Sequence, residues 1–227
     1  MHREPLGRGL FAEGLGSALL AATVVGSGIM AERLAAGNAA VALLANTGAT
    51  AAVLATLIAL LGPLSGAHFN PAVSLVEALR GRLGWYETAW YVGVQVIGCC
   101  AGAVLAHAMF DLPLIQSSTH VRAGGPQLLA EFVATFGLLL VVLGRRRAED
   151  APWMVAAWIG AAYWFTASTS FANPAITLAR SLTNTFSGIR PVDAPWFILA
   201  QIAGALIALG TANRLFGKTR AQGQPMG

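Results

Sequence analysis

Six long apolar segments constrain this chain more than any other feature of its sequence. A helix needs about 20 mostly apolar residues to cross about 30 Å of membrane hydrocarbon. Charged residues make up 11% of the chain, against roughly 25% in soluble domains, which is too few to cover the surface of a soluble protein. The sequence therefore predicts an all-α membrane protein and excludes most soluble, disordered and nucleic-acid-binding classes. The predicted spans are roughly 10–30, 39–62, 88–110, 127–144, 152–169 and 195–215.

The basic residues are unevenly divided between the two sides of the predicted bundle. An even number of spans allows both termini to lie in the cytoplasm. The cytoplasmic side then holds Arg3, Arg8, Arg80, Arg82, Arg145, Arg146, Arg147, Arg214, Lys218 and Arg220. The outer side holds Arg33, Arg122, Arg180 and Arg190. This distribution follows the positive-inside rule, so it predicts a multi-pass protein with both termini in the cytoplasm.

Two shorter segments do not fit six simple spans. One follows the second span and contains Asn70-Pro71, and the other follows the fifth span and contains Asn173-Pro174. Asn is a favoured N-cap, and Pro is favoured at the first helical position. A helix of about ten residues is about 15 Å long, or half of a bilayer. Each segment therefore predicts a half-helix that begins inside the membrane.

The chain also repeats itself. Three markers recur in the same order, first as Glu13, Asn70-Pro71-Ala72 and Gln95, and then as Glu131, Asn173-Pro174-Ala175 and Gln201. Each half has three spans, an odd number, so the two halves must have opposite orientations. The sequence predicts a single domain over residues 1–227, with inverted repeats over about 8–110 and 127–216 and a disordered tail over 217–227. Broken segments at matching places indicate a site near the bilayer midplane.

The paired half-helices predict a pore with a positive electrostatic maximum at its centre. Each helix N-terminus carries roughly half of an elementary charge. Irregular backbone is tolerated at that depth only where it is buried in protein or lines a cavity. We expect Asn70 and Asn173 to point amide donors into this pore, where a neutral hydroxylic molecule would accept them and a cation would be repelled.

The segment Ser-Gly-Ala-His-Phe-Asn-Pro-Ala-Val-Ser at 65–74 resembles the first motif of the aquaporin and glycerol-facilitator family, the major intrinsic proteins, almost letter for letter. The resemblance extends from Phe11 to about Phe216. It implies a right-handed bundle of six transmembrane helices with two re-entrant half-helices, one pore per subunit and a homotetramer in membrane lipid. The implied function is passive passage of water and small neutral solutes.

The second motif departs from the family's usual pattern. Most members carry Arg directly after the second Asn-Pro-Ala, and here that residue is Ile176. Counting without gaps, as the family's pattern implies, places the rest of the constriction at Thr50, Ala161 and Ser170. These side chains predict a wide, weakly polar selectivity filter that admits solutes larger than water, such as glycerol-like polyols and urea. The chain is similar to a bacterial subgroup with an aliphatic residue at this position, associated with arsenite and methylated arsenicals, which implies a bacterial inner membrane.

Four further ionisable residues lie in or near the predicted pore. Arg180 is one helical turn beyond Ile176 and lies either in the outer vestibule or at the membrane interface. His68 either lines the cytoplasmic half of the pore or packs between helices. The family resemblance implies that Glu13 and Glu131 brace the half-helix loops, and the alternative for these buried acids is a proton relay.

Other functions remain open from the sequence. A secondary transporter also uses inverted repeats and broken helices, and an intramembrane protease could use Ser65 and His68. A strict water channel and a non-conducting scaffold are further alternatives. The remaining histidines form no ligand spacing with cysteine or carboxylate, so we expect no metal, no cofactor and no nucleic-acid partner.

Overall fold

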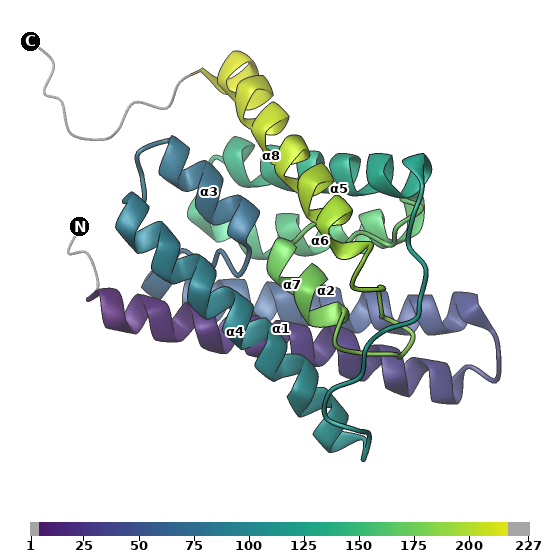
Figure 1. The fold of residues 1–227 in the computed structure, drawn as a ribbon. Helices are drawn as coiled ribbons and strands as arrows, with labels where there is room; N and C mark the ends of the chain where they lie inside the picture. Colours follow the sequence, from purple (N-terminus) through teal and green to yellow (C-terminus); the bar gives the residue numbers. More distant parts are fainter. Residues whose placement is uncertain (1–4, 218–227) are drawn as a thin grey trace, which may run out of the picture.

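The computed structural model describes residues 5–217 and shows a bundle of helices (Figure 1). The elements are α1 (Leu6–Leu34), α2 (Ala39–Ser65), α3 (Pro71–Leu79), α4 (Trp85–Met109), α5 (Gly125–Gly144), the short 3-10 helix η1 (Ala148–Asp150), α6 (Ala151–Phe165), α7 (Pro174–Arg180) and α8 (Ala194–Phe216). The predicted all-α fold is confirmed. Apart from Gly217, the predicted disordered tail lies outside the described residues.

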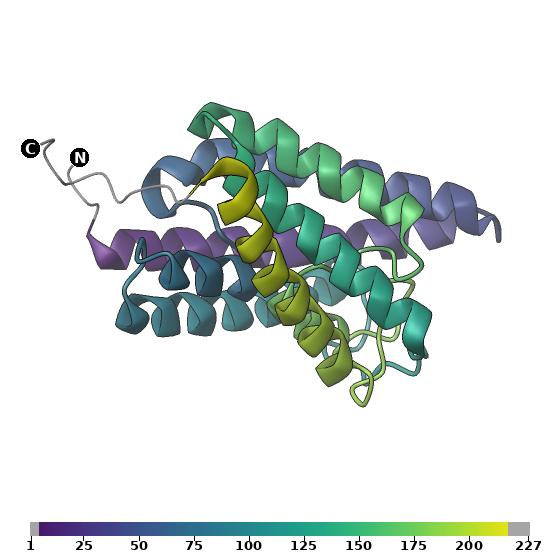
Figure 2. The same cartoon turned by 90° about the horizontal axis from the view of Figure 1, so that it is seen from above.

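The order of elements in the first half recurs in the second half. The helices α1, α2, α3 and α4 correspond to α5, α6, α7 and α8, with a short helix third in each set. Within each half the first helix packs along the fourth, and α7 packs on α4 while α3 packs on α8. Each half-helix is therefore held by a long helix of the other repeat. The start of α1 and the end of α8 lie toward the same side in both views (Figures 1 and 2).

Glycines allow the long helices of each repeat to approach closely. A Cβ atom at Gly98 or Gly102 of α4 would collide with backbone carbonyl oxygens of α1. A Cβ atom at Gly204 of α8 would likewise collide with the carbonyl oxygen of Phe132 on α5. Small residues at such crossings let van der Waals packing hold helices together in lipid.

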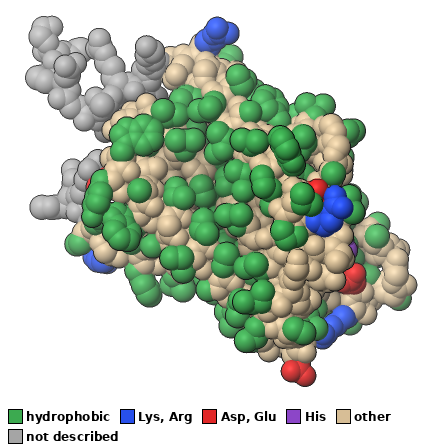
Figure 3. Space-filling model, viewed as in Figure 1, with side chains coloured by type: hydrophobic (Ala, Val, Ile, Leu, Met, Phe, Trp, Pro, Cys, Tyr) green, Lys and Arg blue, Asp and Glu red, His purple; other side chains and the backbone are tan. Residues whose placement is uncertain are grey.

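Five of the described helices, α1, α2, α4, α5 and α8, are long and apolar enough to cross a membrane. The helix α6 has 15 residues, about 22 Å at the usual rise, and η1 precedes it directly. The predicted end of this span at residue 169 is wrong, because the helix stops at Phe165 and the following residues form a loop. On the face of the molecule that is drawn in Figure 3, hydrophobic side chains are spread over the middle and charged side chains lie near the edge.

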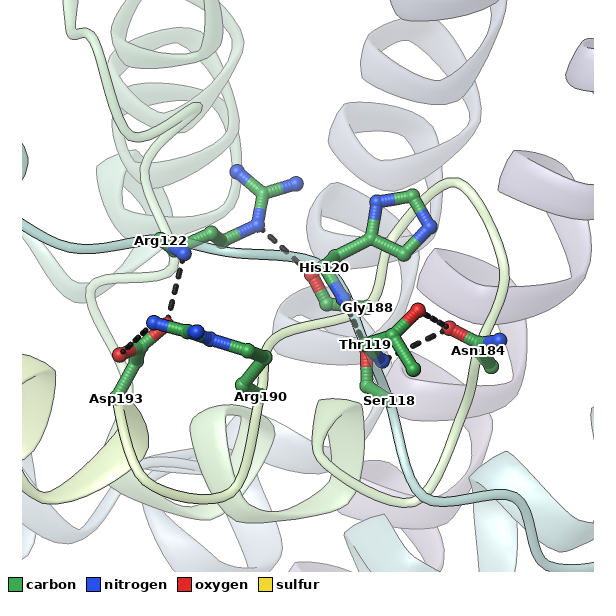
Figure 4. Close-up of polar contacts among 8 residues, drawn as sticks. All are labelled: Ser118, Thr119, His120, Arg122, Asn184, Gly188, Arg190 and Asp193. Carbon is green, nitrogen blue, oxygen red and sulfur yellow. Dashed lines mark hydrogen bonds and ion pairs between the residues drawn. The ribbon is translucent and has the colours of Figure 1, made fainter.

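The loop between α4 and α5 and the loop between α7 and α8 hydrogen bond to each other at one end of the bundle. The Oδ1 of Asn184 accepts hydrogen bonds from the backbone N–H and the hydroxyl of Thr119, each at 2.9 Å (Figure 4). The backbone N–H of Arg122 donates to Oδ2 of Asp193 at 2.9 Å. Arg190 also donates to Asp193, and this hydrogen bond lowers the pKa of the Asp193 carboxyl. These contacts fix the loop that follows the half-helix α7.

Candidate functional site

The loops before α3 and α7 share an uncommon backbone conformation. The residues one and three positions before each motif Asn have left-handed φ angles, between 47° and 53°. They are Ala67 and Phe69 in the first loop and Ser170 and Ala172 in the second loop. Non-glycine residues in this region are strained, and such strain persists only where the surroundings hold it.

A buried glutamate holds each loop. The carboxylate of Glu13 accepts backbone N–H groups from His68 at 2.9 Å and Phe69 at 2.7 Å, and it also accepts the Ser65 hydroxyl. The carboxylate of Glu131 accepts the N–H groups of Phe171 and Ala172, both at 2.9 Å. Both glutamates are fully buried, and neither lines the central cavity. This geometry fits the bracing role, because each carboxylate accepts backbone N–H groups of the loop before a half-helix.

A glutamine ties each brace to its half-helix. Gln95 Nε2 donates to Glu13 at 2.8 Å and to the Ser74 hydroxyl at 3.0 Å. In the second repeat, Gln201 Nε2 donates to Glu131 at 2.6 Å and to the Thr177 hydroxyl at 2.9 Å. Ser74 and Thr177 each lie four residues after the motif Asn, so the contacts of the two glutamines occupy equivalent positions in the two repeats.

The two half-helices meet at their N-termini. The side chains of Asn70 and Asn173 cap them by accepting the N–H groups of Ala72 and Ala175. Each Nδ2 donates across the junction at 2.7 Å, from Asn70 to the carbonyl of Ala172 and from Asn173 to the carbonyl of Phe69. One N–H of each amide is therefore used inside the protein, which the sequence did not predict. Because an amide carries two N–H bonds, one from each Asn remains for a solute.

The remaining motif residues form the tightly packed junction behind these amides. Pro71 and Pro174 occupy the first positions of their helices, as the sequence predicts. Ala72 and Ala175 have no exposed surface. Larger side chains at these positions would separate the two half-helices.

A cavity of about 490 Å³ passes both motif asparagines. Toward the predicted cytoplasmic side its lining includes His68, Glu77 and Arg145, and toward the predicted outer side it includes Thr50 and Ile176. His68 Nδ1 lies 3.0 Å from the Ser74 hydroxyl, and its ring packs against Tyr91. The structure thus places His68 on the cavity wall.

The placement of Ala161 in the constriction is wrong. Ala161 is exposed on the outward face of α6 and does not line the cavity. Tyr163 takes this place instead: it is 3% exposed and lies 3.3 Å from the Thr50 hydroxyl through its own hydroxyl. Residues two positions apart on a helix point in different directions. An error of two residues in the count therefore replaces the phenol of Tyr163 by the methyl group of Ala161.

The other predicted constriction residues lie together. Thr50, Ser170 and Ile176 are each less than 5% exposed and line the cavity toward its predicted outer side, with Tyr163. With Tyr163 in place of Ala161, this part of the cavity wall carries an aromatic ring that the sequence does not predict.

Arg180 is buried in the cavity wall. It is 3% exposed, and its guanidinium carbon lies 3.3 Å from the centre of the Phe171 ring. Its Nε donates to the carbonyl of Ser187. Arg122, which the sequence analysis did not single out, approaches Phe171 at 5.0 Å and donates to the carbonyls of Gly188 and Ser168.

The Ser65 and His68 pair does not form a protease site. Ser65 donates its hydroxyl to Glu13, whereas His68 Nδ1 contacts Ser74. Neither side chain is arranged to activate the other.

Comparison with known proteins agrees with this architecture. Residues 2–167 match the family model described as Major intrinsic protein. The chain belongs to the major intrinsic protein family. Aquaglyceroporins of this family are channels and not enzymes, so membership confirms the channel class.

Several relatives of this major intrinsic protein are known by name. It is 56% identical to "Aquaglyceroporin AqpS" of Rhizobium meliloti, over 97% of this chain and 95% of that protein. It is 32% identical to "Aquaporin A" of Dictyostelium discoideum, over 92% of this chain and 80% of that protein. The X-ray structure of the aquaglyceroporin from Plasmodium falciparum matches the fold with a TM-score of 0.73 and 19% identity, covering 93% of this chain and 97% of that one.

Proposed function

We propose that this major intrinsic protein is a passive transmembrane channel for water and small neutral solutes of glycerol size. The observation that carries the proposal is the cavity that runs past both motif asparagines, where each amide keeps one N–H for a passing hydroxyl group. The half-helix N-termini meet at this point and disfavour cations. The printed names of two relatives, an aquaglyceroporin and a "Probable glycerol uptake facilitator protein" of Thermotoga maritima, support the same solute class.

The proposed solute range includes urea and metalloid hydroxides such as arsenite or methylated arsenicals. The aliphatic Ile176 and the Thr177-Leu178-Ala179-Arg180 continuation support this part through the family resemblance alone. Selection then depends on the width of the constriction and on the half-helix dipoles. We further propose one channel domain over 1–227, assembled as a homotetramer in a bacterial inner membrane with both termini in the cytoplasm.

A strict water channel is the second candidate, and one observation favours it. Tyr163 brings an aromatic ring to the constriction, where the sequence predicts the methyl group of Ala161. The bulk of this ring works against passage of the larger solutes.

Passive conduction is tested by uptake of labelled glycerol into liposomes that contain the purified protein. We expect uptake to stop at equal concentrations on the two sides and to keep the same rate when a proton or sodium gradient is imposed. Empty liposomes give the background rate. Accumulation above the outside concentration under either gradient would show a coupled transporter.

A further inference from the structure

At one end of the cavity, Arg180 and Ser170 each have polar atoms without a hydrogen-bond partner among residues 5–217. Arg180 is 97% buried, yet among residues 5–217 only its Nε has an acceptor, so its two terminal nitrogens have none. Ser170 is likewise 97% buried, and its hydroxyl has no hydrogen-bond partner among the described residues. Both residues line the same cavity. The Ser170 hydroxyl oxygen is a buried atom without a partner, which is uncommon in proteins and calls for a specific explanation. The terminal nitrogens of Arg180 are not among the buried unpartnered atoms of the described residues, so they are open to the cavity that Arg180 lines.

Phe171 links these two residues, which line the same cavity. Ser170 directly precedes Phe171, and the Phe171 ring supports the Arg180 guanidinium face to face. The hydrogen bond from Nε to the Ser187 carbonyl oxygen holds the Nε edge of the guanidinium. Its terminal nitrogens are therefore held in a defined orientation, which reduces the entropy lost when a ligand binds.

The local charge at this end is positive. Arg122 is the second cation acting on Arg180, and Glu131 is the nearby acid. The Glu131 carboxylate already accepts two backbone N–H groups and the Gln201 amide. No carboxylate of the described residues is hydrogen bonded to either guanidinium in this cluster, and the single charge of Glu131 offsets at most one of the two positive charges.

We propose that Arg180 and Ser170 form a binding subsite for a small monoanionic oxyacid at the outer end of the cavity. The guanidinium fork matches the two oxygens of a carboxylate or a similar oxyanion. The Ser170 hydroxyl donates a further hydrogen bond, and Ile176 offers apolar contact to the rest of the molecule. Arg122 acts as a positioning residue, because it packs against Phe171, which carries the guanidinium. The test of this subsite measures the binding of an anion, so its result does not depend on the proposed glycerol flux.

The subsite is tested with acetate as the anionic probe and acetamide as its neutral counterpart of nearly the same shape. Saturation-transfer NMR on the purified full chain in detergent micelles measures the binding of both probes. We expect the native protein to bind acetate about tenfold or more tightly than acetamide, because hydrogen bonds to charged groups are the stronger ones. Equal binding of the two probes would overturn the proposal.

Three variants locate the binding. We expect Arg180→Gln to lose the preference for acetate, and Ser170→Ala to weaken acetate binding several-fold with less effect on acetamide. Alanine already occupies the same left-handed conformation at positions 67 and 172, so Ser170→Ala leaves the loop intact even where Arg180→Gln fails to fold. The matched control is Arg33→Gln, because Arg33 also lies over a phenylalanine ring, Phe110, but is exposed and outside the cavity.

Several results would contradict this assignment. Unchanged acetate binding in Ser170→Ala, or an equal loss in Arg33→Gln, would show that acetate responds to surface charge. Competition between added phospholipid and acetate would assign the guanidinium to a lipid headgroup, whereas we expect no competition at a site inside the cavity. Normal glycerol flux without acetate binding would refute the subsite and leave the channel proposal standing.

Discussion

Replacing Glu131 by leucine is expected to prevent the accumulation of folded protein. The change removes the acceptor of two buried backbone N–H groups and of the Gln201 amide. Each orphaned donor costs about 1–3 kcal/mol. Three of them approach the whole stability of a typical domain, about 5–15 kcal/mol. Glu13→Leu should have a similar effect, because Glu13 holds the first loop in the same way.

The measurement is the monodisperse yield and the thermal midpoint of each variant in detergent. Glu131→Gln is the informative intermediate, because the amide keeps one acceptor oxygen but turns an NH₂ group toward donors. Glu32→Gln is the matched control on the exposed end of α1 and should match the native protein. A Glu131→Leu protein with the native midpoint would show that the carboxylate does not hold the loop.

Replacing Ile176 by arginine is expected to abolish glycerol passage while water passage persists. Ile176 is 4% exposed and lines the cavity with Tyr163, one helical turn before Arg180. A longer, charged side chain at this position narrows an already aromatic constriction. Even one methylene in a tight pocket is worth about 1–3 kcal/mol, or roughly 10–200-fold, and arginine exceeds isoleucine by more than this. Glycerol flux should therefore fall by at least about tenfold.

Stopped-flow light scattering on liposomes of matched protein content separates the two fluxes. Ile176→Val keeps an aliphatic side chain and should conduct both solutes like the native protein. Tyr163→Ala restores the wide opening that the sequence predicts and should increase glycerol flux. Glycerol flux that is equal in the native and Ile176→Arg proteins would mean that position 176 does not control the constriction.

The half-helices were predictable because their signals are local. An Asn followed by Pro fixes an N-cap and a first helical residue, and both segments fold in this way. The recurrence of Glu13 as Glu131 and of Gln95 as Gln201 similarly located the two brace networks. The structure adds the specific contacts, such as the donation from each motif Asn to the opposite loop.

The outer constriction was predicted less well, for a physical reason. Which residue of α6 points inward depends on where the helix ends, and the loop after Phe165 contains left-handed residues, including Thr169, that no periodic pattern reveals. Counting residues back from the second motif without gaps therefore placed Ala161, and not Tyr163, in the constriction. Arg122 was missed because its role depends on contacts with Ser168 and Gly188, which are distant in sequence.

The central claim is that neutral solutes larger than water pass the paired asparagines without an energy source. Its most direct test is osmotic stopped-flow on liposomes containing the native protein, with glycerol, urea and arsenite as successive external solutes. We predict that the vesicles first shrink and then reswell as the solute enters, with both phases faster than in empty liposomes. Faster shrinkage with no faster reswelling for any of the three solutes would contradict the claim, because Tyr163 and Ile176 would then close the constriction to everything but water.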